Sequence, residues 1–236
     1  MTTFVLVPGM WLGAWVWRDV TARLRADGHD VYPLTPTGLA DRRHLGSPQV
    51  DLDTHTTDIT ALIEAEELTD VVLAGHSYGG FPVTAAVDRI PDRIRAAVYV
   101  DGGPLPSGMS LEDTKDPAER TPEPADGWQV PPPVWAERDP QVIAGLSPAM
   151  LELLQRRATP HPYGSLRQPL ALTGAGEKVP RVLIASTFST DEVRAMIAQG
   201  HPWFGGLADA RLIGVPTGHW PMLSEPAALA QALASV

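Results

Sequence analysis

The amino-acid sequence predicts an α/β fold in which helices flank a mostly parallel sheet. Short runs rich in valine, leucine and isoleucine recur along the 236 residues, and segments with helical periodicity separate them. This alternation is typical of parallel strands that are buried on both faces. The length fits one domain with a full core and room for an insertion, so we predict a single domain over residues 1–236.

The apolar runs predict strands at residues 4–7, 31–34, 71–74, 96–100, 182–185 and 210–215. Between the first two, residues 15–26 place Trp17, Val20 and Leu24 on one helical face, and Gly28 follows as a C-terminal stop. The same periodicity predicts helices at residues 53–67, 79–89, 190–199 and 226–234.

Residues 103–179 interrupt this alternation. They are dense in proline, aspartate and glutamate, with Trp128, Trp135 and Leu146 interspersed. Such a segment cannot continue the sheet, because proline lacks the N–H that a strand ladder needs. One interpretation is a long surface excursion or linker. We favour the other, a cap insertion whose tryptophans and leucines form the apolar wall of a pocket over the active site.

Composition narrows the classes of partner. The 18 basic and 28 acidic residues give a formal charge of −10, which disfavours non-specific attraction to nucleic acid or anionic membranes. The absence of cysteine excludes disulfides, thiolate zinc sites and cysteine nucleophiles. No leader pattern precedes the first apolar run, and no apolar stretch approaches the roughly 20 residues that cross a bilayer. We therefore expect a cytoplasmic protein with a small-molecule substrate and no nucleic-acid, membrane or cofactor partner, and leave a homodimer open.

Residues 71–80 predict a nucleophile turn. The sequence Val-Val-Leu-Ala-Gly-His-Ser-Tyr-Gly-Gly indicates a buried strand, a tight turn with Ser77 at its apex, and a helix start. Gly75 and Gly79 leave space for the strained backbone that such a turn requires. The helix N-terminus favours negative charge developing beside the hydroxyl. A fortuitous glycine turn is the alternative, but the flanking strand and helix favour Ser77 as a nucleophile.

A serine nucleophile needs a base, and in the chain order that accompanies a G-x-S-x-G nucleophile turn the catalytic histidine comes last, in a loop after the final strand. His219 fits, since it follows the last predicted strand and precedes the closing helix. The alternative is a histidine held in a surface turn. We expect His76 to serve packing or hydrogen bonding. No metal-ligand spacing of the H-x-H or H-x-x-x-H type occurs among His44, His55, His161 and His201.

The turn after the first strand predicts oxyanion donors. Pro8-Gly9-Met10 can expose backbone N–H groups toward Ser77, and we assign the oxyanion hole to the N–H groups of Met10 and Tyr78. A simple loop between a strand and a helix is the alternative, but it leaves Gly9 unexplained.

These motifs resemble those of the compact α/β-hydrolase family that includes plant methylesterases, hydroxynitrile lyases and bacterial esterase-like relatives. The resemblance covers nearly the whole chain and rests on residues 4–9 (Phe-Val-Leu-Val-Pro-Gly), 13–17 (Gly-Ala-Trp-Val-Trp), 75–80 (Gly-His-Ser-Tyr-Gly-Gly) and 218–219 (Gly-His). It implies the α/β-hydrolase fold. Many relatives carry a histidine at the position of Pro8; its loss removes a side-chain donor but leaves the backbone turn.

The resemblance also bears on the reaction. Plant hydroxynitrile lyases of this family have a threonine after the first strand and a lysine directly after the catalytic histidine, whereas Gly9 and Trp220 stand at those positions here. Cyanohydrin cleavage is therefore disfavoured, and hydrolysis of an ester or related acyl compound is favoured.

The triad acid departs from the family pattern. In most members it follows the strand after the cap, where this chain has Ser-Thr-Phe-Ser-Thr before Asp191. Ser189 and Glu192 predict a capping box that places Asp191 in a first helical turn. Asp101 ends the strand at 96–100, and some lipases and dehalogenases of this fold place their acid there. We favour Asp101 over its alternative role in starting a turn, and keep Asp191, or no charged acid, open.

The sequence therefore predicts a serine hydrolase that cleaves a small, apolar or aromatic ester through Ser77, His219 and Asp101 and an acyl-enzyme. A lyase, cyclase or dehydratase of specialised metabolism, using the same site for acid-base chemistry, is the alternative. A ligand-binding protein on a hydrolase scaffold is a third reading, against which the presence of both Ser77 and His219 argues.

Overall fold

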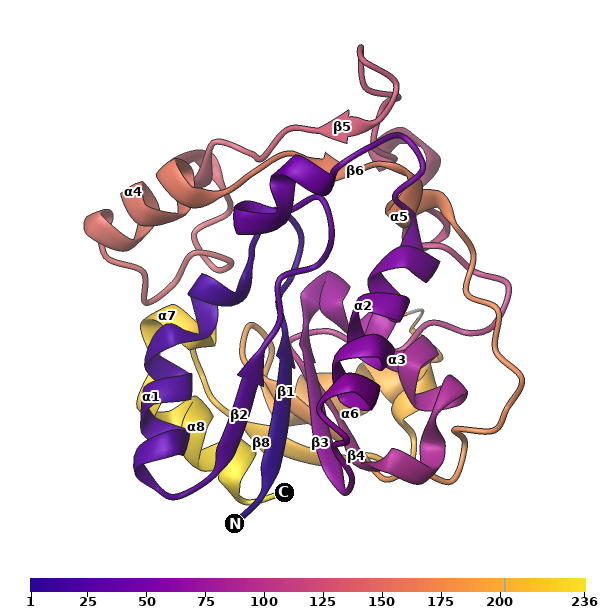
Figure 1. The fold of residues 1–236 in the computed structure, drawn as a ribbon. Helices are drawn as coiled ribbons and strands as arrows, with labels where there is room; N and C mark the ends of the chain where they lie inside the picture. Colours follow the sequence, from indigo (N-terminus) through magenta and orange to yellow (C-terminus); the bar gives the residue numbers. More distant parts are fainter. Residues whose placement is uncertain (202) are drawn as a thin grey trace.

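A six-stranded parallel sheet lies between two layers of helices in the computed structural model, which describes residues 1–201 and 203–236 (Figure 1). The strand order is β2-β1-β3-β4-β7-β8, and every neighbouring pair is parallel. The strands are β1 (Thr3–Val7), β2 (Asp30–Pro33), β3 (Val71–His76), β4 (Ile94–Val100), β7 (Arg181–Ala185) and β8 (Arg211–Gly214). The predicted fold class, a mostly parallel sheet flanked by helices, is confirmed.

The helices cover both faces of the sheet. They are α1 (Arg18–Ala26), α2 (Leu52–Ala65), α3 (Gly80–Arg89), α4 (Pro148–Arg157), α5 (Gly164–Arg167), α6 (Thr190–Ala198), α7 (Pro221–Ser224) and α8 (Pro226–Ala234). Helices α1 and α8 pack on one face, and α2, α3 and α6 on the other (Figure 1). Strand β1 alternates between them, since Phe4 and Leu6 enter the first core and Val5 and Val7 the second. Burial on both faces explains why its sequence is continuously apolar.

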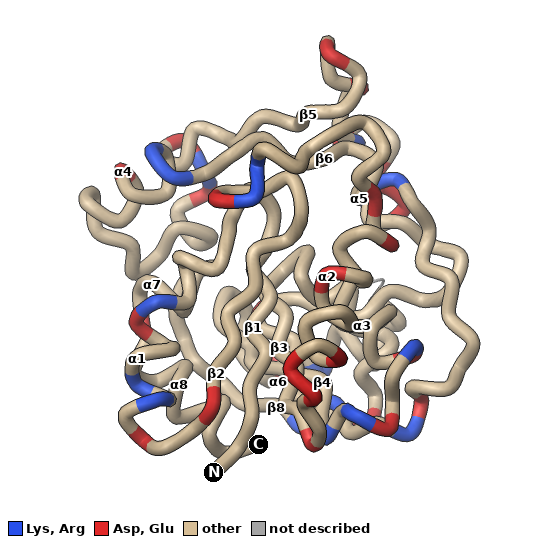
Figure 2. Tube along the Cα trace, in the orientation of Figure 1, with Lys and Arg blue, Asp and Glu red and all other residues tan. Residues whose placement is uncertain are grey.

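Charged residues lie mainly on the helices and loops at the periphery (Figure 2). Strands β1 and β3 at the centre of the sheet carry no Lys, Arg, Asp or Glu. Within the described parts of the chain, no helix has the length and hydropathy that a membrane span requires.

Between β4 and β7 the chain leaves the sheet for the segment of residues 103–179, called the cap segment below. It holds α4, α5 and a short antiparallel ribbon of β5 (Gln129–Val130) and β6 (His161–Pro162), in which Val130 pairs with His161. The ribbon lies beyond the carboxyl ends of the sheet strands (Figure 1). Consistent with its proline content, the segment adds no strand to the main sheet.

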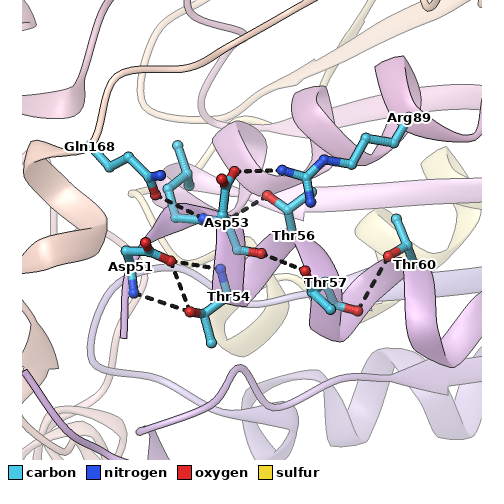
Figure 3. A network of polar contacts seen from close by, with 9 residues as sticks. Asp51, Asp53, Thr54, Thr56, Thr57, Thr60, Arg89 and Gln168 are labelled. Atoms are coloured by element: carbon cyan, nitrogen blue, oxygen red, sulfur yellow. Dashed lines mark hydrogen bonds and ion pairs between the residues drawn. The ribbon is translucent and has the colours of Figure 1, made fainter. Parts of the chain in front are cut away.

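The start of α2 connects the cap segment to the helical layer (Figure 3). Asp51 caps the helix by accepting a hydrogen bond from the backbone N–H of Thr54 at 2.8 Å. In the same first turn, the N–H of Asp53 donates to Gln168 at 2.9 Å, and the carboxylate of Asp53 pairs with Arg89 of α3. The exposed ion pair contributes at most about 1 kcal/mol. The hydrogen bond from the Asp53 N–H, and not the ion pair, connects α2 with Gln168 at the end of α5.

A second connection is formed by Asp88 in the last turn of α3. Its carboxylate accepts hydrogen bonds from the N–H and hydroxyl of Thr173, at 2.6 and 2.9 Å, and from the N–H groups of Gly174 and Gly176. These donors all belong to the part of the cap segment that returns to β7. One carboxylate therefore holds the returning chain against α3.

Candidate active site

Strand β3 runs directly into a tight turn that presents Ser77. A 3₁₀ turn spans Ser77–Gly79, and α3 follows it without a break. Ser77 has a φ of 52°, in the left-handed region that residues other than glycine seldom adopt. The turn is also crowded, since a Cβ on Gly75 would lie 2.4 Å from the carbonyl oxygen of Gly79, and one on Gly79 would lie 2.7 Å from that of Pro8. Both glycines are therefore required by space.

His219 lies between the serine hydroxyl and a carboxylate. Its Nε2 is 2.9 Å from Ser77 Oγ, and its Nδ1 is 2.6 Å from Asp101 Oδ2. The loop between β8 and α7 carries this imidazole, and its backbone N–H is fixed by a 2.7 Å hydrogen bond to the carbonyl of Val142 in the cap segment. With Nδ1 protonated toward the carboxylate, Nε2 is free to accept the proton of the serine hydroxyl.

Asp101 follows the last residue of β4 with a φ of 47°. Its Oδ1 accepts the backbone N–H groups of Ser186 and Thr187, both at 2.9 Å. Its Oδ2 accepts the hydroxyl of Thr187 at 2.6 Å in addition to His219. Burial alone would raise the pKa of this carboxyl, but the hydrogen bond and charge of His219 and the Thr187 donors outweigh it and hold the pKa well below its usual range. Asp101 is therefore a carboxylate.

The other candidate acid, Asp191, is not brought to His219. Ser189 and Glu192 form the capping box that the sequence predicts, and Asp191 lies in the first turn of α6. Its side chain is 90% exposed and pairs with Arg194. The loop after β7, where most relatives carry the acid, contributes Ser186 and Thr187 as donors to Asp101 instead.

Met10 and Tyr78 lie beside Ser77 in the same cavity. Within the described residues, the backbone N–H of Met10 donates to no protein acceptor. Tyr78 is the second residue of the turn that Ser77 begins, a position at which a helical N–H has no carbonyl one turn earlier. Both residues therefore line the cavity next to the Ser77 hydroxyl.

The cavity that contains Ser77 and His219 has a volume of about 560 Å³. Aromatic side chains dominate its walls, namely Trp11, Tyr78, Trp135, Trp203 and Trp220. Trp135, from the cap segment, packs edge-on against both Trp11 and Trp220, with ring centroids 5.8 and 5.0 Å apart. Three charged residues of the cap segment, Lys115, Glu119 and Arg138, also line it. The cavity therefore has aromatic walls with a charged part that the cap segment contributes.

His76 forms a hydrogen bond with the backbone of His219. Its Nε2 lies 2.6 Å from the carbonyl oxygen of His219, and the two rings are 4.8 Å apart. Burial, followed by repulsion from the charge of His219, lowers the pKa of His76 to about 3. The ring is therefore neutral and donates its Nε2–H to that carbonyl.

Several functional contacts were not predicted from the sequence, including those of Ser186 and Thr187 with Asp101. A serine-threonine pair at the end of a strand is too common to predict donors.

Among the described residues, no group of His, Asp or Glu side chains gathers in a way that could hold a metal ion.

Comparison with known proteins agrees with this architecture. Residues 4–232 match the alpha/beta hydrolase family. The chain is 34% identical over 262 aligned residues, covering 100% of both proteins, to the carbendazim hydrolyzing esterase of Nocardioides sp. (strain SG-4G). It is 27% identical to methylesterase 17 of Arabidopsis thaliana, over 94% of this chain and 87% of that protein.

Solved structures show the same fold. An extracellular alpha/beta-hydrolase from a Paenibacillus species superposes with a TM-score of 0.83 at 22% identity, covering 100% of this chain and 98% of that one. The Arabidopsis methylesterase MES16 superposes with a TM-score of 0.75 at 23% identity, over 100% and 98% of the two chains. The chain therefore belongs to the α/β hydrolase family of enzymes.

Proposed function

We propose that the protein is a serine esterase that hydrolyses a small ester, or a related acyl compound, with an apolar or aromatic group. The observation that carries this proposal is the continuous hydrogen-bonded series from Ser77 Oγ through His219 to Asp101, at 2.9 and 2.6 Å, inside an aromatic cavity. Similarity over the full length to a protein named as an esterase supports the same reaction class.

The reaction proceeds through an acyl-enzyme. Ser77 Oγ attacks the ester carbonyl while His219 Nε2 accepts its proton. Asp101 keeps Nδ1 protonated and stabilises the imidazolium that forms. The N–H groups of Met10 and Tyr78 hold the oxyanion of the tetrahedral intermediate. His219 then returns the proton to the departing alcohol, and a water molecule, activated by the same imidazole, releases the acid.

The substrate class follows from the cavity walls and volume. A cavity of about 560 Å³ falls within the size range of small-molecule sites, and its tryptophans favour a flat aromatic group by stacking and edge contacts. The 34% identical relative is named as a carbendazim hydrolyzing esterase. We therefore propose aryl methyl esters and carbendazim as the first substrates to test.

The geometry favours hydrolysis over a lyase, cyclase or dehydratase reaction. That alternative rests on the atypical acid, and the Asp101 carboxylate, 2.6 Å from the imidazole of His219, supports hydrolysis instead.

Two reactions of Ser77 test the proposal together. The wild-type protein is expected to form a stable adduct with a fluorophosphonate and to release p-nitrophenol from an activated ester in a burst of one equivalent per site. Ser77→Ala should lose both, whereas the control Ser47→Ala, away from the cavity, should keep both. Absence of adduct and burst in the wild-type protein would exclude a serine esterase.

A further inference from the structure

Trp11, the residue after the proposed oxyanion donor Met10, is held by the cap segment at three points. Its backbone N–H donates to His161 Nδ1 at 3.2 Å, and its indole Nε1–H donates to the carbonyl of Val130 at 3.1 Å. Its own carbonyl accepts the N–H of Thr159 at 3.0 Å. Val130 and His161 are the paired residues of the β5–β6 ribbon. The ribbon therefore holds the backbone N–H and the indole of Trp11, and Thr159, just before β6, holds its carbonyl.

These hydrogen bonds hold Trp11 in a strained backbone conformation. Trp11 has a φ of 65°, a left-handed conformation that costs a bulky residue about 1–3 kcal/mol and persists only where the surroundings enforce it. The turn of residues 8–11 is short, and its other end is fixed because β1 leads into it. Where Trp11 is held therefore decides where the preceding N–H, that of Met10, points.

His161 is built to accept the Trp11 N–H. Its Nε2 lies 2.9 Å from Ser165 Oγ, and that hydroxyl donates to the carbonyl of Pro162 at 2.8 Å. The hydroxyl hydrogen is thus committed, so His161 must carry its proton on Nε2 and leave Nδ1 as an acceptor. The imidazole is fully buried, and burial, followed by the charge of His55, lowers its pKa well below the usual value. A neutral ring with one fixed tautomer results.

The same buried imidazoles reach the second oxyanion residue. The hydroxyl of Tyr78 lies 2.7 Å from His55 Nδ1, and His55 Nε2 lies 2.8 Å from the carbonyl of Thr37. Because Nε2 must donate to that carbonyl, Nδ1 accepts the Tyr78 O–H. The Tyr78 and His161 rings pack edge-on, with centroids 4.6 Å apart. The buried pair His55 and His161 therefore contacts both Tyr78, which carries one proposed donor, and Trp11, which follows the other.

We propose that His161 is a positioning residue for the oxyanion hole, acting through the Trp11 N–H, and that the β5–β6 ribbon is a fixed part of the active site. The inference rests on the proposed function, since it assigns Met10 N–H to the oxyanion. Loss of the His161 acceptor should therefore weaken the binding of the transition state and not that of the substrate, because the ester carries no oxyanion before attack. We expect kcat to fall with little change in KM.

Two amide substitutions distinguish the roles of the two ring nitrogens of His161. His161→Asn places an oxygen near the position of Nδ1 and keeps the acceptor, whereas His161→Gln reaches the position of Nε2 and offers no acceptor near Nδ1. We expect His161→Gln to lower kcat for an aryl ester by about 10–100-fold, less than or comparable to the loss of one oxyanion donor. His161→Asn should stay within about fivefold of wild type, on the same principle of a retained hydrogen bond.

An oxyanion probe supplies a second readout. An aryl trifluoromethyl ketone adds to the serine hydroxyl and places an alkoxide in the oxyanion hole. Its inhibition constant should rise in His161→Gln in proportion to the loss in kcat/KM and stay near the wild-type value in His161→Asn. A general loosening of the cap segment would weaken the binding of substrate and of this inhibitor alike.

The outcomes are distinguishable from failure of the proposed function. A wild-type protein that neither hydrolyses the ester nor forms the fluorophosphonate adduct would overturn the esterase proposal. A wild-type protein that is active, with His161→Gln and His161→Asn equally active or equally impaired, would overturn only the role of His161. If thermal unfolding shows His161→Gln to be unfolded, His161→Phe replaces it, because a phenyl ring keeps the packing but offers the Trp11 N–H no acceptor. His161→Phe should lower kcat in the same way, and an unchanged kcat in His161→Phe would refute the role.

Discussion

At the scale of single residues, the proposed acid, Asp101, is held by hydrogen bonds from two loops. Asp101 leaves the end of β4, while Ser186 and Thr187 from the loop after β7 donate to it. Relatives with an acid after β7 hold the histidine from that neighbouring strand. In this chain the carboxylate follows β4 and its donors follow β7, and the two meet because adjacent parallel strands end at the same edge of the sheet.

This arrangement predicts how two aspartates differ. Asp101→Asn should lower kcat for an activated aryl ester by about 10³–10⁴-fold, because an amide no longer holds Nδ1 protonated and favours the wrong tautomer. Asp191→Asn should leave kcat within about twofold, since an exposed ion pair contributes little. Steady-state kinetics of both variants decides the matter. Loss of turnover in Asp191→Asn alone would show that the acid lies on α6.

The sequence was sufficient to find Ser77, His219 and Asp101 as candidates and insufficient to find what holds them. A serine between glycines after an apolar strand, a histidine after the last strand, and an aspartate at a strand end are local signals. Thr187 and His161 act on residues 86 and 150 positions away in the chain, so their partners depend on tertiary packing. The structure supplies these long-range contacts, which no short motif contains.

At the scale of elements, the strands and long helices follow from periodicity, whereas the cap segment does not. The predicted helix at 79–89 becomes a 3₁₀ turn at Ser77–Gly79 followed by α3, because the turn must tighten to present the hydroxyl. In the cap segment, β5 and β6 have two residues each and α5 has four. Elements so short show no hydrophobic period, and their formation depends on contacts with Trp11 and the N-terminus of α2.

The junction between α3 and the returning cap segment predicts a pH-dependent stability. Burial would raise the pKa of Asp88, but hydrogen bonds from Thr173, Gly176 and Gly174 outweigh it and lower the pKa below its usual value. A carboxyl with a lowered pKa in the folded state stabilises the protein above its unfolded-state pKa, about 3.9. That contribution disappears as the pH falls from there through the lowered folded-state pKa.

Asp88→Asn tests this junction. At pH 7 the free energy of unfolding should fall by about 1–3 kcal/mol, because an amide cannot accept all the donors that the carboxylate accepts. The difference from wild type should shrink as the pH falls below about 4. Denaturant unfolding at pH 7 and at pH 3 measures both values, with the exposed Asp92→Asn as a control. A difference that is absent at pH 7, or unchanged at pH 3, would contradict the assigned role.

At the scale of the whole molecule, the cavity is assembled from parts that are distant in sequence. The turn after β1, the Ser77 turn, the cap segment and the loop after β8 each contribute a wall. Trp135 connects three of them by packing on Trp11 and Trp220. The alternation of strands and helices was enough to predict the sheet. The contacts of Trp135 with Trp11 and Trp220 were not predictable, because the sequence of the cap segment shows no hydrophobic periodicity that would place its tryptophans.

Trp135→Ala should therefore change the substrate preference of the site. Removing the indole takes away the aromatic surface that a flat substrate would contact, while Ser77 and His219 keep their hydrogen bonds. We expect kcat/KM to fall by about tenfold for an aryl methyl ester and by less than about threefold for a short aliphatic ester, since one lost aromatic contact is worth roughly 0.5–1.5 kcal/mol. Equal losses for both esters would indicate a general distortion and contradict a role in selectivity.

The central claim, that Ser77 carries the acyl group, is tested most directly by trapping the intermediate. Wild-type protein is mixed with the p-nitrophenyl ester of an aromatic acid and quenched in acid during the burst. Mass spectrometry of its peptides should then find one acyl group on Ser77. Ser77→Ala should carry none, and Asp101→Asn should accumulate it more slowly. Continued ester turnover by Ser77→Ala, or an acyl group found on a residue other than Ser77, would contradict the account.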